Sequence, residues 1–118
     1  MPAARSELDV HRITELQALL GTGREAIVGT LMTELSTAVA RIDEGLESGD
    51  LAGVAAAAHA ARNSALMIDA QPMLRVLKQL ETCARNGEPE GAVAAQARLR
   101  RVWPRLQRQL ERAADSPT

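Results

Sequence analysis

Apolar residues recur at intervals of three and four along most of this chain, and this period restricts the fold more than any other feature. The clearest run consists of Ile27, Leu31, Leu35, Ala38, Ile42 and Leu46. Such spacing puts the side chains on one face of a helix, whereas a half-buried strand needs strict alternation. Because each apolar face must be buried against another, the pattern predicts an antiparallel bundle of helices.

Turn residues place the first two predicted helices. The first covers about residues 6–20 and ends at Gly21, because glycine readily adopts the left-handed conformation that closes a helix. Thr22 and Glu25 have the spacing of a capping box, in which the two side chains bond backbone amides at a helix start. A long second helix is therefore predicted to begin at this box.

A turn at Ser48–Asp50 predicts that the next two helices are antiparallel. Gly49 can close the second helix, and Asp50 can cap a third helix over residues 51–68. The seam that this third helix is predicted to bury has small residues in its middle, which let a neighbouring backbone come close. Its members are Leu51, Val54, Ala58, Ala61, Ala65 and Ile68.

Prolines mark the remaining helices. Pro72 predicts the start of the fourth helix, since a first-turn residue needs no amide hydrogen. A fifth helix follows, and Pro104 inside it predicts a kink or a local break. We expect one all-α domain over residues 1–118, an antiparallel four-helix bundle with an additional short N-terminal helix. It should be ordered over about residues 6–112, with a flexible tail at 113–118.

The charge balance argues against nucleic acid and membrane surfaces as partners. Fourteen basic and fifteen acidic residues give a formal net charge of -1, so no overall charge attracts a polyanion. Six arginines nevertheless gather near the C-terminus: Arg98, Arg100, Arg101, Arg105, Arg108 and Arg112. A solvated helix face is the preferred interpretation, because no aromatic residues for base stacking lie among them. An Arg-rich helical adaptor for an acidic protein or for nucleic acid remains an alternative.

The cysteine and histidine content restricts the possible disulfides and metal sites. Cys83 is the only cysteine, so no disulfide can form within the chain, and His11 and His59 are too far apart in sequence to suggest a metal site. The sequence also lacks the patterns of a membrane span and of a signal peptide. We expect a cytoplasmic protein that binds no metal. Cys83 and Trp103 are interpreted as packing residues, and His11 as an exposed residue of the first helix.

His59 is the strongest candidate for chemistry. A helix has about 3.6 residues per turn, so His59 shares a face with Ala55 and Arg62 and has only small alanines beside it. Imidazole can be neutral at physiological pH and still nucleophilic, and it can carry a phosphoryl group on nitrogen. Arg62 can stabilise phosphoryl oxygens through its charge. From this geometry alone, a structural or merely exposed histidine is the simpler interpretation.

The residues around His59 resemble a known family signature. The run Ala58-His59-Ala60-Ala61-Arg62-Asn63-Ser64-Ala65 is followed by Ile68-Asp69-Ala70. It is similar to the signature of histidine-containing phosphotransfer (HPt) domains, in which the histidine is followed by Lys-Gly-Ser-Ser and later by Gly-Ala. The segments Leu46–Asp50 and Leu77–Gly87 also resemble parts of the family, and the resemblance covers about residues 8–112.

The resemblance implies an intermediate of a multistep phosphorelay. His59 would accept a phosphoryl group from the aspartyl phosphate of a response-regulator receiver domain and return it or pass it to another receiver, with Arg62 as its charge partner. Such domains have no kinase activity, so the chain would be a phosphocarrier rather than a self-contained enzyme. It would have no cofactor of its own, because the Mg²⁺ belongs to the receiver. The implied partners are receiver domains or a hybrid histidine kinase.

Three residues depart from the family pattern. Arg62 replaces a lysine, which keeps the charge and changes its geometry. Asn63 replaces a glycine and adds a polar group on the face that a partner must touch. Asp69 replaces the glycine before Ala70, and its carboxylate is predicted to cap the helix at Pro72. These changes leave open a degenerate module that binds receivers or a kinase without efficient transfer.

The predicted docking surface surrounds His59. Its small or apolar members are Ala55, Ala56, Ala60, Leu66 and Met67, and the approach to the ring is predicted to be lined by Asn63 and Ser64. We expect a monomer, because the helices can bury their apolar stripes within one bundle.

Overall fold

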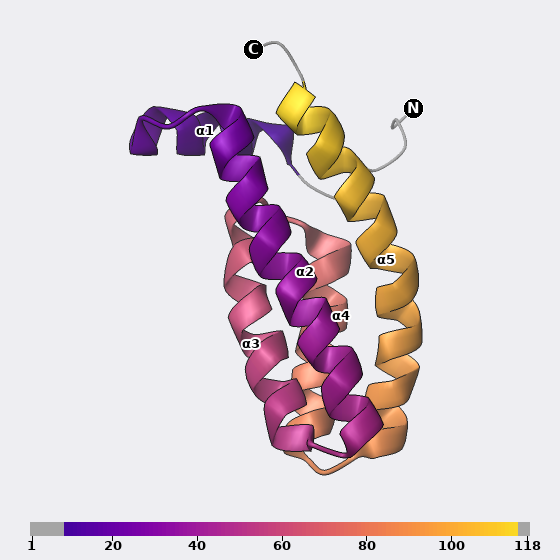
Figure 1. Ribbon diagram of the computed structural model, residues 1–118. Coiled ribbons are helices and arrows are strands. Elements are labelled where there is room, and N and C mark those ends of the chain that lie inside the picture. The colour runs from indigo at the N-terminus through magenta and orange to yellow at the C-terminus, as the bar shows by residue number, and fades with distance from the viewer. Residues whose placement is uncertain (1–8, 116–118) are drawn as a thin grey trace.

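The arrangement of helices follows the apolar period. The structure is a computed structural model that describes residues 9–115. These residues form five helices and no strand: α1 (Val10–Leu20), α2 (Arg24–Ser48), α3 (Leu51–Met67), α4 (Gln71–Arg85) and α5 (Pro89–Asp115). Helices α2 to α5 alternate in direction as a four-helix bundle, and α1 lies across one end (Figure 1). The predicted all-α bundle with an additional short N-terminal helix is confirmed.

The core lies between the four long helices. α3 packs between α2 and α4, and α5 completes the bundle against α4 and α2. Fully buried side chains come from every one of these helices and include Leu35, Ile42, Val54, Leu77, Leu99 and Leu106. α1 adds the buried Ile13 and packs against α2. Burial of one such side chain is worth about 1.5–3 kcal/mol, so the contacts between these faces hold the bundle together.

The turn between α2 and α3 fixes how closely these two helices approach. Gly49 closes α2 with a φ of 78°, and the Asp50 carboxylate accepts a hydrogen bond from the amide of Gly53 at 2.9 Å. Both predictions for this turn are confirmed. Gly45 is also buried there, and a Cβ atom on it would lie 2.6 Å from Cγ2 of Val54. A residue without a side chain therefore lets α3 pack directly on the α2 backbone.

The predicted capping box does not form. Gly23, rather than Thr22, occupies the N-cap position of α2, and no side chain caps this helix. Thr22 lies one residue too far from the helix start for its hydroxyl to cap the first-turn amides. The start of α2 is instead tied to α1, because Arg24 Nη2 donates a hydrogen bond to Thr14 Oγ1 at 2.9 Å.

Pro104 does not interrupt α5. The helix continues through the proline, so the predicted local break is wrong, although the helix curves along its length (Figure 1). Trp103 and Leu106, on either side of the proline, are both buried in the bundle. Their packing offsets the one backbone hydrogen bond that proline removes. Within residues 9–115, no helix combines the length and the apolar character needed to cross a membrane.

The ends of the chain differ in part from expectation. α5 extends to Asp115, so residues 113–115 of the tail that was predicted to be flexible are helical. α1 begins at Val10, with the Asp9 carboxylate accepting a hydrogen bond from the amide of His11. Residues 6–8 of the predicted first helix and residues 116–118 lie outside the described residues.

The turn between α3 and α4 places an aspartate in a left-handed conformation. Asp69 has a φ of 50°. It does not cap α4, because Ala70 occupies the N-cap position, and the Asp69 carboxylate instead accepts a hydrogen bond from the Gln71 side-chain amide. The predicted cap is therefore wrong. Glycine, which has no Cβ atom, suits this backbone conformation better than aspartate does.

We expect Asp69→Gly to be more stable than Asp69→Ala by about 1 kcal/mol, because only alanine keeps the Cβ atom in the left-handed region. Both substitutions remove the hydrogen bond to Gln71, so the comparison isolates the backbone term. Urea unfolding of the two variants measures the difference. Equal free energies of unfolding would show that this turn relaxes to another conformation.

Candidate functional site

The site is centred on His59, which lies in the middle of α3 and projects from the side of the bundle. Its side chain is 59% exposed. Ala56 and Ala60, beside it on the same helix, are also exposed and are too short to cover the ring. The imidazole is therefore accessible to the surface of another protein.

A carboxylate from α4 holds one side of the imidazole. Nδ1 of His59 lies 2.9 Å from Oε2 of Glu81, within hydrogen-bond distance. The Glu81 side chain is only 4% exposed, so the contact is formed at the boundary between α3 and α4 and not in bulk water. Since the other ring nitrogen, Nε2, lies on the opposite side of the imidazole, Glu81 leaves that atom for a partner.

Two arginines balance the charge of this buried carboxylate. Arg62 Nη1, from α3, donates a hydrogen bond to Glu81 Oε1 at 2.6 Å, and Arg85 Nη2 lies 2.7 Å from Oε2. A buried carboxylate is costly without such partners, and charge-assisted contacts of this length are among the stronger ones. His59, Arg62, Glu81 and Arg85 thus form one linked cluster, which we call the Glu81 cluster.

The Glu81 cluster keeps its carboxylate ionised. Burial alone raises the pKa of Glu81, but the hydrogen bonds from Arg62 and His59, together with the charges of Arg85 and His59, outweigh it, and the pKa lies below the ordinary value of 4.5. At neutral pH, Glu81 is therefore an acceptor for the proton on Nδ1 of His59.

This shift predicts how stability depends on acidity. Because the folded-state pKa of Glu81 is lowered, its contribution is fully present above pH 4.5 and is lost as the pH falls through the lower, folded-state value. We expect the unfolding free energy of the wild type to fall more steeply below pH 4.5 than that of Glu81→Gln. Urea titrations across this range measure both slopes, and parallel curves would contradict the prediction.

Other cationic residues border the histidine. His59 lines a pocket of about 320 Å³ together with Arg62, Asn63, Leu66, Gln71, Leu74, Arg75 and Lys78. Arg75 and Lys78 come from α4, and both are exposed. The positive charge around the ring is therefore supplied by two helices and not by Arg62 alone.

The predicted docking residues divide into two groups. Ala56, Ala60, Asn63, Leu66 and Met67 are exposed on α3, on the surface around His59. Ala55 and Ser64 are 6% and 2% exposed, so neither can serve as an open contact for a partner. Ser64 faces α2 instead, where its hydroxyl donates a hydrogen bond to Glu34 Oε2 at 3.1 Å. The prediction that Ser64 lines the approach to the ring is therefore wrong, and so is the placement of Ala55 on the docking surface.

Sequence reasoning missed Glu81, Arg85, Arg75 and Lys78 as members of the site. A signal for Glu81 was present, because it follows Leu77 by four residues and so falls on the buried face of α4. A carboxylate at such a position requires cationic partners. The sequence instead indicated Cys83 as a packing residue, which the structure leaves only partly buried.

The other residues considered for a functional role lie outside the Glu81 cluster. His11 is exposed on α1, away from the Glu81 cluster, and Trp103 is buried against the core. Cys83 packs beside the core, with its Sγ atom close to Gly91 of α5. Among the described residues, no group of three or more histidine, cysteine, aspartate or glutamate side chains is arranged to hold a metal ion.

Comparison with known proteins identifies the family. The Hpt domain model matches residues 26–116, which include α3, α4 and the whole Glu81 cluster. No curated protein and no solved structure gives a match. The matched segment is most of the chain, and it carries the exposed histidine in a four-helix bundle. The chain therefore belongs to the Hpt domain family and is a histidine phosphotransfer module of phosphorelay signalling.

Proposed function

We propose that His59 accepts a phosphoryl group from the aspartyl phosphate of a receiver domain and passes it to a second receiver. The observation that carries this proposal is the position of the ring. Its Nδ1 is bound by the buried Glu81 at 2.9 Å, while the side chain as a whole stays 59% exposed. One nitrogen is fixed by the protein, and the other is presented to a partner.

Glu81 sets the protonation of the ring in this proposal. An ionised carboxylate can only accept a hydrogen bond, so the Nδ1 beside it carries the proton and Nε2 keeps its lone pair. The Nε2 lone pair attacks the phosphorus of the aspartyl phosphate. A new N–P bond forms, the bond between phosphorus and the carboxyl oxygen breaks, and its electron pair stays on the receiver's aspartate. The imidazole becomes cationic, and Glu81 stabilises that charge.

The exposed cations of α4 supply charge for the phosphoryl oxygens. Arg62 donates to Glu81 through Nη1, so part of its guanidinium is already engaged. Lys78 and Arg75 line the same pocket as His59, and among the described residues neither makes an ion pair with an acidic side chain. We assign them a share of the role that was predicted for Arg62 alone. The Mg²⁺ of the reaction belongs to the receiver.

Exposed apolar side chains support docking near the ring. Leu66 and Met67 are 60% and 43% exposed at the C-terminal end of α3. Ala60, beside His59, has too short a side chain to obstruct a docking protein. Burial of such side chains by a receiver removes apolar area from water, while the charged residues around the pocket orient it. The proposed contact surface is the exposed face of α3 with the adjoining edge of α4.

A receiver-binding module without efficient transfer is the second candidate. It is favoured by Asn63, which is exposed beside the ring and adds bulk where the family has glycine, and by the engagement of Arg62 with Glu81. The two candidates share a docking surface and differ in whether the N–P bond forms.

Transfer from a panel of phosphorylated receiver domains, with Mg²⁺ present, tests the proposal. The phosphocarrier predicts that one or more receivers lose their phosphoryl group while the wild-type chain gains an acid-labile adduct. Binding without an adduct would favour the transfer-deficient module. Absence of both binding and adduct across the panel would remove the receiver-based function.

A further inference from the structure

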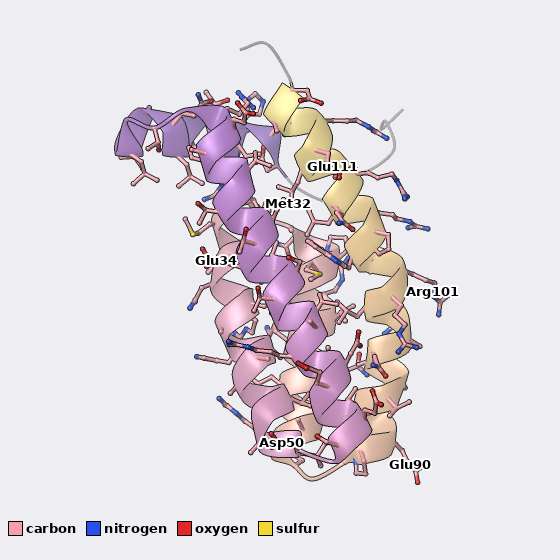
Figure 2. The ribbon with its side chains drawn as sticks, in the orientation of Figure 1. Met32, Glu34, Asp50, Glu90, Arg101 and Glu111 are labelled. Atoms are coloured by element: carbon pink, nitrogen blue, oxygen red, sulfur yellow. The ribbon has the colours of Figure 1, made fainter. Side chains whose placement is uncertain are left out.

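A second charged surface lies on α5, away from the Glu81 cluster. Five arginines follow one another at intervals of three and four residues and are all exposed: Arg98, Arg101, Arg105, Arg108 and Arg112. This spacing places them along one face of the helix, and at 1.5 Å per residue they extend over about 21 Å. The labelled Arg101 shows how a member of this row projects outward from the bundle (Figure 2). We call these five residues the arginine stripe.

Within residues 9–115, no acidic side chain pairs with the arginine stripe. Among the described residues, none of its five guanidinium groups forms an ion pair, whereas Arg62 and Arg85 both bind Glu81. Like charges three or four residues apart on a helix repel each other and lower its stability. A surface that is merely solvated commonly mixes charges of both signs. The uniform positive charge of the stripe therefore destabilises the free protein, and a bound polyanion would reduce this repulsion.

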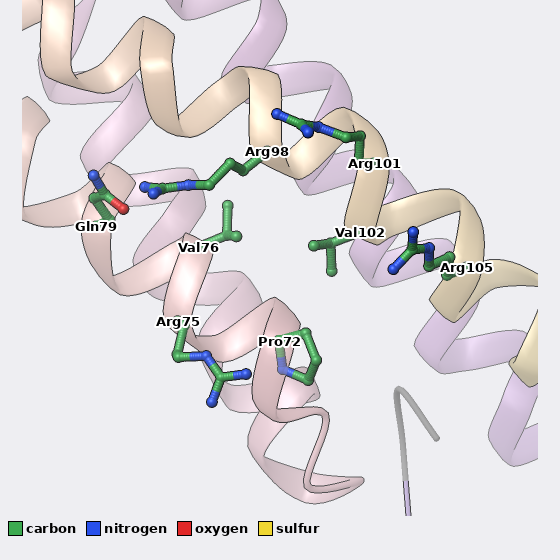
Figure 3. Close-up of a pocket in the computed structure, with 8 residues that line it drawn as sticks. All are labelled: Pro72, Arg75, Val76, Gln79, Arg98, Arg101, Val102 and Arg105. Atoms are coloured by element: carbon green, nitrogen blue, oxygen red, sulfur yellow. The ribbon is translucent and has the colours of Figure 1, made fainter. Parts of the chain in front are cut away.

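The stripe borders a groove that has an apolar floor. The groove measures about 480 Å³ and is lined by Pro72, Arg75, Val76 and Gln79 of α4 and by Arg98, Arg101, Val102 and Arg105 of α5. Val76 and Val102 face each other between the two helices, and Arg98 reaches from α5 across toward α4 (Figure 3). Val76 is buried, at 5% exposed, whereas Val102 is partly exposed, so Val102 offers the apolar contact between the arginines of α5 and Arg75 of α4.

We propose that the arginine stripe and this groove bind an acidic segment of a protein partner. A segment that carries both carboxylates and apolar side chains fits the two features together, with the carboxylates on the arginines and the apolar side chains over Val102. A single phosphate is too small to engage a row about 21 Å long. Base stacking on an aromatic side chain is not offered by the described surface, because Trp103 is 8% exposed and faces the core.

Arg75 connects this surface with the histidine. It lines the groove beside α5 and also the pocket that contains His59. A protein that docks over His59 can therefore extend an acidic segment into the groove without crossing unrelated surface. This connection rests on the proposed function, whereas binding of an acidic segment by the stripe does not.

The test uses a fluorescent peptide of glutamates interrupted by leucine at every third position, with binding followed by anisotropy on the full chain. We expect the triple variant Arg98→Gln, Arg101→Gln and Arg105→Gln to raise the Kd about tenfold or more. The matched control changes Arg12, Arg41 and Arg100 to glutamine. These three are also exposed but lie outside the groove and the stripe, so the control removes equal charge and should keep near wild-type affinity.

The arms of this experiment separate the possible ligands and the possible failures. Equal weakening in the two triple variants, or no peptide binding by the wild type, would overturn the proposal. Tighter binding of oligothymidine with the same number of charges would also overturn it, because the surface would then favour nucleic acid. His59→Ala should bind the peptide like the wild type, so the outcome does not depend on phosphoryl transfer.

Discussion

His59→Ala is expected to form no acid-labile phosphoryl adduct with any receiver that phosphorylates the wild type. The substitution removes the only atom to which we assign the N–P bond, and no residue of the Glu81 cluster can replace it, since the other members are arginines and a carboxylate. The side chain is 59% exposed, so its removal leaves little unfilled space in the core. Transfer kinetics with radiolabelled receiver measure the effect.

His11→Ala is the matched control. His11 is the other histidine of the chain, it is exposed on α1, and it lies outside the pocket that contains His59. This variant should gain the adduct at the wild-type rate. An adduct that persists in His59→Ala and disappears in His11→Ala would show that α1 carries the phosphoryl group, which would contradict our proposal. Receiver binding by His59→Ala then shows whether docking survives the loss of the acceptor.

Glu81→Gln is expected to slow transfer to His59 by about 10- to 100-fold, by analogy with the loss found when the hydrogen-bond partner of a metal-binding imidazole is replaced. Glutamine keeps the size of the side chain and removes its negative charge. Its amide can either donate to or accept from Nδ1, so the ring is no longer held in the tautomer that leaves the lone pair on Nε2. The cationic imidazole that forms on phosphorylation also loses its counter-charge.

A purely structural role for Glu81 predicts a different pattern. Ring nitrogen shifts measured by NMR report the His59 tautomer directly, and we expect them to change in Glu81→Gln. Glu34→Gln is the control, because Glu34 bonds Ser64 on the other side of α3 and does not contact the ring; Figure 2 labels its position on α2. Unchanged His59 shifts and an unchanged rate in Glu81→Gln would show that the carboxylate only stabilises the bundle.

The class of fold could be predicted from the sequence, and the sequence also indicated His59 as the candidate for chemistry. The three-four spacing from Ile27 to Leu46 was sufficient for a helical bundle, because burial of a one-sided apolar face leaves few other solutions. The turn at Gly49 and Asp50 could also be predicted, since both residues act through local backbone geometry. The exposure of His59 followed from its alanine neighbours on the same helix.

Three features of the backbone could not be predicted from neighbouring residues, because they depend on packing or on the residue at which a helix begins. Pro104 predicts a kink or a local break in α5, but buried residues on both sides keep the helix continuous. Thr22 lies one position too early to cap α2. The spacing of Thr22 and Glu25 is compatible with a capping box, but it does not show whether the helix begins directly after Thr22 or one residue later. Asp69 adopts a left-handed conformation because the chain must reverse between two helices that pack closely, which no neighbour in sequence dictates.

The groups that surround the imidazole of His59 depend on how the helices pack. Glu81 is separated from His59 by 22 residues, and only the packing of α3 on α4 brings its carboxylate to 2.9 Å from Nδ1. The same packing turns Arg62 toward Glu81 and brings Lys78 to the histidine pocket, while the contact with α2 buries Ser64. Helical periodicity tells which face a residue occupies, but the partner across that face depends on how the helices are placed in space.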